Sequence, residues 1–176
     1  ANTIAAESDR PVKTKGIELT DLQREIDDHS ISYGNLVIEL DRQTNTARFR
    51  IIGPDDTAPQ DVSEAQSRGA GLWTLALARE LDDAILYLRA NEPSLGNWLF
   101  QSLGDIDRVR DYDGFLEKNS EHWLIREIIL YWKRVMKRLD VSSRSIVTAI
   151  EPNSCFVGFL LEVALASDQV FMLDGE

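Results

Sequence analysis

Two long segments of the chain repeat apolar residues at helical spacing. In Leu72 to Ala90, leucine, isoleucine and alanine return every three or four positions, with acidic residues between them. This period gathers the apolar side chains on one face, so the pattern predicts a helix that packs on a core. The second segment follows Ser120, a residue type that favours the N-cap position, and its wide apolar face extends from Trp123 to Leu139. A second long helix is therefore expected there.

Shorter segments have the composition of β-strands. Asn35 to Leu40 and Ala47 to Ile52 are rich in β-branched residues and flank a polar turn, which predicts a β-hairpin. Further along the chain, three more segments are strand candidates: Trp98 to Ser102, Ser145 to Ile150 and Gln169 to Leu173. A helix is expected between the last two strands, over Gly158 to Ala166.

The remaining segments are more polar. Leu19 to His29 carries Leu22 and Ile26 four residues apart, which favours a short helix. Pro54 to Ser67 contains two prolines and few apolar residues, so an exposed loop is expected. The charged run from Asp107 to Asp113 is expected at the surface.

Strands and helices alternate along most of the chain. Such an order is typical of crossover connections with helices packed on a sheet, so the expected fold class is α/β. We divide the chain into a polar N-terminal lead-in, residues 1–30, and one α/β domain, residues 31–176. Because the sequence starts without Met and stops directly after a strand-like run, we expect it to be the N-terminal part of a longer chain.

The composition argues against several classes of partner. The chain has 176 residues, 43% of them hydrophobic, which suffices for one domain with its own core. Its net charge of −11 argues against nucleic acid or an anionic membrane as partner, since both would repel it. No apolar run approaches the roughly 20 residues of a membrane span, and the single cysteine cannot form an internal disulfide. We expect a cytoplasmic protein.

The segment from Ser145 to Met172 has the arrangement best suited to chemistry. A strand is followed by a loop of small and polar residues and then by a helix with Glu162 in its first turn. The first N–H groups of a helix have no partner inside the helix and carry positive partial charge. A carbonyl oxygen that becomes negatively charged accepts hydrogen bonds from such groups. The segment therefore suits an oxyanion site.

This segment resembles the crotonase superfamily, whose members have a strand, a loop with Asn and Gly, a glycine-rich helix start, a Glu and a closing Asp. The residues at the matching positions are Asn153, Gly158, Glu162, Ala164 and Asp168. Upstream, the run FQSLGDI, Phe100 to Ile106, resembles the strand end where crotonases place the other oxyanion donor. The resemblance covers roughly Tyr33 to Leu173 and implies a crotonase-like spiral core of ββα units.

The resemblance also implies roles for individual residues. The implied backbone oxyanion donors are Gly104 and Phe159. The implied catalytic residues are Glu162 and Cys155, and the implied substrate-binding residues are Gly158, Asp105 and Asn153.

Most of these assignments have a structural alternative. A glutamate in a first turn complements the helix dipole, a lone cysteine is often a small buried apolar residue, and Asp105 also suits a helix cap. A nucleophilic Cys155 is disfavoured because neither His29 nor His122 stands in a recognisable relation to it. Four basic residues of the second long helix are interpreted as a solvated face, with contacts to CoA phosphates as the alternative: Lys133, Arg134, Lys137 and Arg138.

Within the superfamily, the loop Asn153 to Gly158 and the insertion Pro54 to Leu72 resemble the benzoyl-CoA-dihydrodiol lyase group. That group implies hydrolytic C–C ring cleavage of an epoxidised benzoyl-CoA, which gives a 3,4-dehydroadipyl-CoA semialdehyde and formate. An enoyl-CoA hydratase or isomerase and a non-catalytic acyl-CoA-binding module are the alternatives. The resemblance implies a homodimer and no cofactor beyond the CoA of the substrate, and no residue spacing predicts a metal site.

Overall fold

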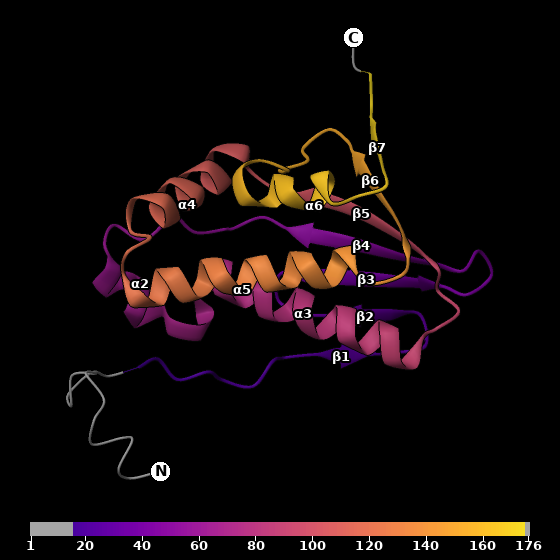
Figure 1. Cartoon of the computed structure of the whole chain (residues 1–176), viewed down its shortest axis with the longest axis horizontal. Coiled ribbons are helices and arrows are strands. Elements are labelled where there is room, and N and C mark those ends of the chain that lie inside the picture. The colour runs from indigo at the N-terminus through magenta and orange to yellow at the C-terminus, as the bar shows by residue number, and fades with distance from the viewer. Residues whose placement is uncertain (1–15, 175–176) are drawn as a thin grey trace.

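A sheet of seven strands forms the centre of the described part of the chain, residues 16–174, in the computed structural model. The strands lie side by side in the order of the sequence (Figure 1). They are β1 (Glu25–Ile26), β2 (Ser30–Ser32), β3 (Leu36–Asp41), β4 (Thr46–Ile52), β5 (Asn97–Leu103), β6 (Ser145–Ile150) and β7 (Gln169–Met172). Neighbours from β1 to β4 are antiparallel, whereas neighbours from β4 to β7 are parallel. The parallel half therefore needs long crossover connections.

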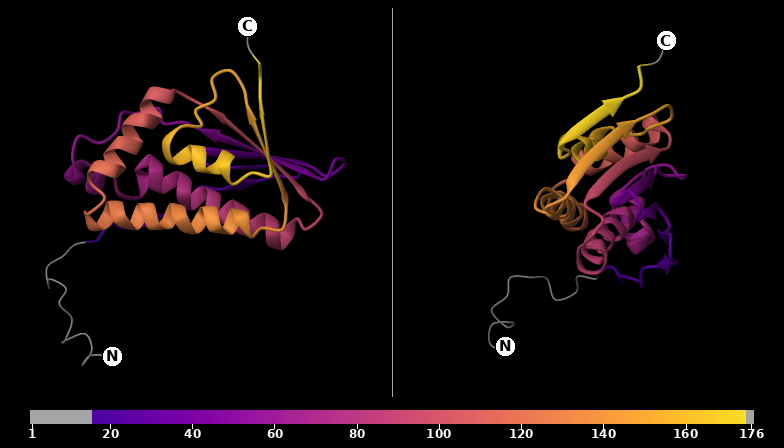
Figure 2. Two further views of the ribbon diagram at one scale, coloured as in Figure 1. Left: turned by 45° about the horizontal axis from the view of Figure 1, so that its top comes forward. Right: turned by 90° about the vertical axis from the view of Figure 1, so that its right-hand side faces the viewer.

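Helices make these crossovers. β4 leads to β5 through α2 (Val62–Arg68), η1 (Gly69–Gly71) and α3 (Trp73–Asn91). β5 leads to β6 through α4 (Ile106–Lys118) and α5 (Trp123–Asp140), and β6 leads to β7 through η2 (Gly158–Leu160) and α6 (Leu161–Leu165). Figure 2 shows α3 and α5, which contact each other, together on one face of the sheet. The expectation of an α/β fold with helices packed on the sheet is confirmed.

The core lies between the sheet and these helices. Ile38 and Phe49 are opposite each other in the β3–β4 hairpin and are fully buried. Phe49 stacks on Phe100 of β5 with 4.3 Å between the ring centroids. From the helices, Leu81 of α3 and Ile128 of α5 are among the residues buried against this layer. The hairpin and both long helices are thus confirmed, because their apolar periods match the face that they bury.

The helix expected over Leu19 to His29 does not form. Its residues have no regular structure except in β1, which pairs with β2. The Asp27 carboxylate accepts hydrogen bonds from the amides of His29 and Ser30, each across 2.7 Å, and so closes the turn between these strands. Two apolar residues give too narrow a face to favour a helix over sheet pairing.

The expected lead-in is described only in part. Residues 1–15 lie outside the described part of the chain, and β2 crosses residues 30 and 31, where we placed the boundary to the α/β domain. The division into lead-in and domain stays a prediction.

Two polar segments contain helices that the sequence analysis does not anticipate. α2 lies largely within the loop expected over Pro54 to Ser67, and its N-cap is Asp61, whose carboxylate accepts a hydrogen bond from the Glu64 amide across 2.9 Å. The charged run Asp107 to Asp113 lies within α4, and Tyr112 in that run is fully buried. The expectation of a purely exposed segment is therefore wrong for α4, which packs one face on the core.

The start of α5 also differs from the expectation. Ser120 lies in the turn before the helix, which begins at Trp123 after His122, so Ser120 is not its N-cap. Among residues 16–174, no helix, α5 included, has both the length and the apolar character that crossing a membrane requires.

Candidate functional site

A cavity of about 680 Å³ lies where α4, α5, η2 and α6 meet. Of the ten residues that line it, five are apolar, four are charged and one is a glycine. The lining residues are Asp113, Leu116 and Glu117 of α4, Ile129, Trp132, Lys133 and Met136 of α5, and Gly158, Phe159 and Glu162 of η2 and α6. Segments far apart in the sequence therefore build one site, with the C-terminal segment as one wall.

Aromatic rings form the apolar part of this site. The Phe159 ring contacts Trp132 with 4.8 Å between centroids and Trp73 with 5.5 Å. Both indoles are held by hydrogen bonds to backbone carbonyls: Trp132 donates to Thr74 across 2.9 Å, and Trp73 donates to Ile52 across 3.1 Å. The two indoles that contact Phe159 are thus held in place, and the rings of Trp132 and Phe159 form an apolar wall of the cavity.

Asp113 of α4 contacts the first residues of η2. Its carboxylate accepts a hydrogen bond from the Phe159 amide across 3.1 Å. It also packs on Gly158, where a Cβ atom would lie 2.5 Å from the Asp113 Cγ atom. Gly158 has φ +53°, a conformation that residues with a side chain rarely adopt. A glycine is therefore required at position 158 for both the backbone turn and the close approach of Asp113.

Three further charged side chains line the cavity: Glu117, Lys133 and Glu162, all exposed. Glu162 lies in the first turn of α6, as predicted. In the part of the chain that the structure describes, no group of three or more His, Cys, Asp and Glu residues is arranged to hold a metal ion. Exposed charged groups on a cavity wall can take part in proton transfer and in polar contacts with a ligand.

Three of the seven predicted site residues line this cavity. Gly158, Phe159 and Glu162 line the cavity, whereas Gly104, Asp105, Asn153 and Cys155 are not among the residues that line it. The two predicted oxyanion donors both have partners within the chain. The Gly104 amide donates to the Asn153 carbonyl across 3.0 Å, and the Phe159 amide donates to Asp113. Neither N–H is free for a ligand unless its hydrogen bond breaks.

Cys155 is packed inside the protein and has no access to solvent. It is completely buried, and a Cβ atom on either Gly53 or Gly104 would lie 3.3 Å from its Sγ atom. Its amide donates to the Ser102 hydroxyl across 2.9 Å. Burial raises the pKa of the Cys155 thiol, so the thiol form is favoured. This environment fits the alternative of a small buried apolar residue, and the catalytic role of Cys155 stays a prediction.

Asp105 and Asn153 both accept hydrogen bonds from backbone amides. The Asp105 carboxylate accepts hydrogen bonds from the amides of Asp107 and Arg108 across 2.8 and 3.4 Å, which makes it the N-cap of α4. Asn153 has φ +67°, and its carbonyl holds the Gly104 amide. The cap alternative for Asp105 is confirmed, and the substrate-binding roles of both residues stay predictions.

The four basic residues of α5 do not form one site. Arg138 pairs with Asp82 across 2.7 Å, and the Arg134 guanidinium lies 4.9 Å from the centre of the Tyr131 ring. Of the four, Lys133 alone is among the residues that line the cavity, and its contact with CoA phosphates stays a prediction. The charged cavity-lining residues without a predicted site role are thus Asp113 and Glu117.

Comparison with known proteins finds one relative by sequence and a similar fold among solved structures. The chain is 40% identical over 174 residues to a benzoyl-CoA-dihydrodiol lyase of Aromatoleum evansii. The aligned region covers 99% of this chain and 31% of the relative. The chain thus spans about a third of the length of that protein. No family model matches the chain.

A solved enoyl-CoA hydratase from Geobacillus kaustophilus has a similar fold, with a TM-score of 0.51. The match has 16% sequence identity and covers 81% of this chain and 47% of the hydratase, so it shows the fold alone. The predicted resemblance is confirmed on both counts: the fold is that of crotonases, and the sequence is similar to that of the lyase.

Proposed function

Because the chain is similar in sequence to a benzoyl-CoA-dihydrodiol lyase and has the crotonase fold, we propose that the whole protein is an enzyme that acts on an aromatic-derived acyl-CoA thioester. The observation that carries this proposal is the identity of 40% over 174 residues, which is 99% of the chain. The cavity supports it independently, since about 680 Å³ with an aromatic wall lies in the usual range of small-molecule sites.

The proposed reaction is hydrolytic C–C cleavage of an epoxidised benzoyl-CoA ring. The substrate takes up two water molecules, the ring opens with loss of one carbon as formate, and a 3,4-dehydroadipyl-CoA semialdehyde remains. Carbon, hydrogen and oxygen balance without an oxidant or reductant, so the proposal needs no cofactor beyond the CoA of the substrate.

Backbone amides would stabilise the negative charge that develops on the thioester carbonyl. We assign this role to the amides of Gly104 and Phe159, each of which would contribute about 3 kcal/mol to transition-state stability. The carbonyl oxygen must take the place of Asp113 at the Phe159 amide and of the Asn153 carbonyl at the Gly104 amide. Ligand binding is therefore coupled to a local rearrangement at η2.

Glu162 is the carboxylate that we assign to water activation and proton transfer. It lines the same cavity as Phe159, three residues further along the chain, so a substrate held at the Phe159 amide lies within reach of its side chain. A homodimer in the cytoplasm completes the proposal and rests on the resemblance to crotonases.

The decisive experiment uses the full-length protein with 2,3-epoxybenzoyl-CoA. We expect stoichiometric formate together with the semialdehyde-CoA, measured by a formate dehydrogenase assay and by mass spectrometry. Hydration of crotonyl-CoA without formate would replace the lyase by a hydratase. Binding of acyl-CoA without conversion of either compound would replace it by a non-catalytic binding module.

A further inference from the structure

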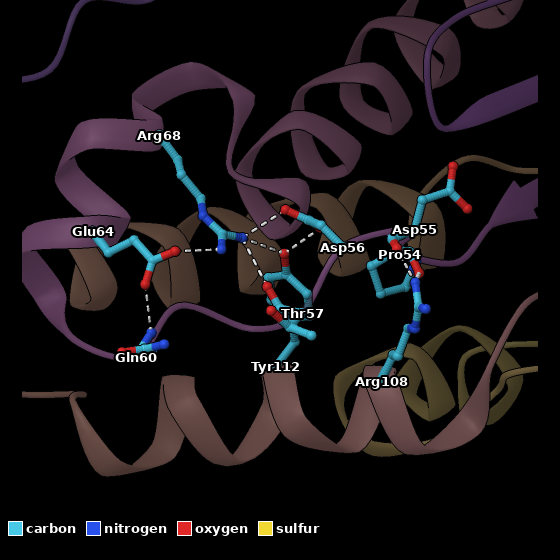
Figure 3. A network of polar contacts seen from close by, with 9 residues as sticks. All are labelled: Pro54, Asp55, Asp56, Thr57, Gln60, Glu64, Arg68, Arg108 and Tyr112. Atoms are coloured by element: carbon cyan, nitrogen blue, oxygen red, sulfur yellow. Dashed lines mark hydrogen bonds and ion pairs between the residues drawn. The ribbon is translucent and has the colours of Figure 1, made fainter.

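A closed set of hydrogen bonds joins α4 to the loop after β4 (Figure 3). The Tyr112 hydroxyl donates to the Asp56 carboxylate across 2.7 Å and accepts from the Arg68 guanidinium across 3.0 Å. Arg68 in turn pairs with Asp56 across 2.6 Å. Each of the three groups contacts the other two, and we call them the Tyr112 network. A triangle of this kind fixes the direction of the Tyr112 side chain more firmly than a single bond.

The network is anchored in the fold. The Tyr112 residue is fully buried, and burial raises the pKa of its hydroxyl, which therefore stays protonated and able to donate. The Arg68 side chain is only 21% exposed and also donates to the Thr57 carbonyl across 2.8 Å. One turn before Tyr112 in α4, Arg108 donates to the carbonyls of Pro54 and Asp55. The loop and α4 are thus joined at two successive turns.

A neighbouring side of the same helical turn reaches the cavity. Tyr112 is followed by Asp113, and consecutive residues of a helix point about 100° apart. Tyr112 therefore faces the loop, while Asp113 faces η2 and holds the Phe159 amide. The rings connect the two sides as well, because Trp73 contacts Tyr112 with 5.2 Å between centroids and Phe159 with 5.5 Å. A rotation of α4 that releases one contact must disturb the other.

We infer that Tyr112, Arg68 and Asp56, which do not line the cavity, are positioning residues that hold α4 where Asp113 reaches the Phe159 amide. The consequence for catalysis rests on the proposed function, which assigns this amide to the thioester carbonyl. The network then sets how often the amide is free, and the apparent affinity for substrate rises in proportion to that fraction.

Tyr112→Phe is the direct test, because it removes only the hydroxyl and keeps the buried ring. In the full-length protein, hydrogen–deuterium exchange of the Phe159 amide, followed by mass spectrometry of short peptides, should become about fivefold faster. Asp113→Ala gives the upper limit of this exchange. Glu64→Gln is the matched control, since Glu64 contacts Arg68 from outside the triangle across 2.6 Å and should leave the exchange unchanged.

Kinetics separate a positioning role from general damage. For Tyr112→Phe the KM for 2,3-epoxybenzoyl-CoA should fall by the same factor as the exchange rises, with kcat within about twofold of the unmodified protein. A loosened structure would raise KM instead.

The outcomes are distinct. Unchanged exchange at Phe159 in Tyr112→Phe overturns the inference, whatever the kinetics show. Faster exchange with an unchanged KM, or in a protein without turnover, supports the positioning role and refutes the proposed use of the Phe159 amide.

Discussion

The Asp113 carboxylate accepts a hydrogen bond from the Phe159 amide across 3.1 Å, so an acidic side chain fills the position that the proposed mechanism gives to a thioester oxygen. The two residues lie 46 positions apart in the sequence and meet only because α4 packs beside η2. In that mechanism, a substrate has to compete with this internal acceptor. The affinity for substrate should then depend on the side chain at position 113.

Asp113→Ala should lower the KM for the acyl-CoA substrate about tenfold, because a hydrogen bond to a charged acceptor no longer competes for the amide. Asp113→Asn is the matched control: it keeps an acceptor oxygen without the charge and should give an intermediate KM. Steady-state kinetics on the full-length protein measure both. A KM that rises in Asp113→Ala would mean that Asp113 helps to bind the substrate rather than to exclude it.

The Cys155 thiol should react slowly with alkylating reagents and take no part in catalysis. Because the thiol is buried with a raised pKa, iodoacetamide should modify it at least about 100-fold more slowly in the folded than in the unfolded protein. Cys155→Ala should cost about 1 kcal/mol of stability through the small cavity that it leaves, and kcat/KM should stay within about threefold. Rapid alkylation that abolishes turnover would restore the catalytic role expected from the sequence.

Glu162→Gln should lower kcat about 100-fold with little change in KM, since the amide cannot accept a proton during the reaction. Glu127→Gln, an exposed position on α5 outside the cavity lining, serves as the control for loss of one negative charge. Full turnover in Glu162→Gln would remove this residue from the mechanism.

The elements that follow from the sequence are those with a wide apolar face. α3 and α5 present buried residues at helical spacing, and β3 and β4 alternate, so their periods are visible without a structure. α4 is harder to recognise because most of its other residues are charged. Its buried residues are Val109, Tyr112, Phe115 and Leu116. Their spacing is helical, and the Asp105 cap precedes them, so this pattern could have identified the helix.

The site was harder to predict than the fold. The wall formed by Gly158, Phe159 and Glu162 follows from one contiguous motif, which the sequence displays. Asp113, Glu117 and Lys133 join it from α4 and α5 only after packing, and no local pattern encodes such contacts. Gly104 and Cys155 lie close together, since a Cβ atom on Gly104 would lie 3.3 Å from the Cys155 Sγ atom. Their backbone amides, however, bond to Asn153 and Ser102 within the chain. A motif thus indicates where a backbone lies better than which of its groups are free.

Glu80 gives the stability a pH dependence of predictable sign. It is a buried residue of α3 whose carboxylate accepts hydrogen bonds from the backbone and side-chain amides of Asn35 across 2.8 and 3.0 Å. Desolvation raises its pKa, although the bonds to Asn35 oppose this shift. A carboxyl with a raised pKa in the folded state contributes its stability below the unfolded pKa of about 4.3, and loses it as the pH rises through the folded value.

The free energy of unfolding should therefore fall with rising pH relative to that of Glu80→Gln, whose side chain does not titrate. Urea denaturation of the unmodified protein and of the variant, at a series of pH values from about 4 to neutrality, measures this difference. The free energy of unfolding of the unmodified protein minus that of the variant should be highest at the acidic end. It should stop changing once Glu80 is ionised in both the folded and the unfolded protein. The opposite slope would mean that the hydrogen bonds from Asn35 outweigh desolvation, so that the folded protein favours the ionised carboxylate.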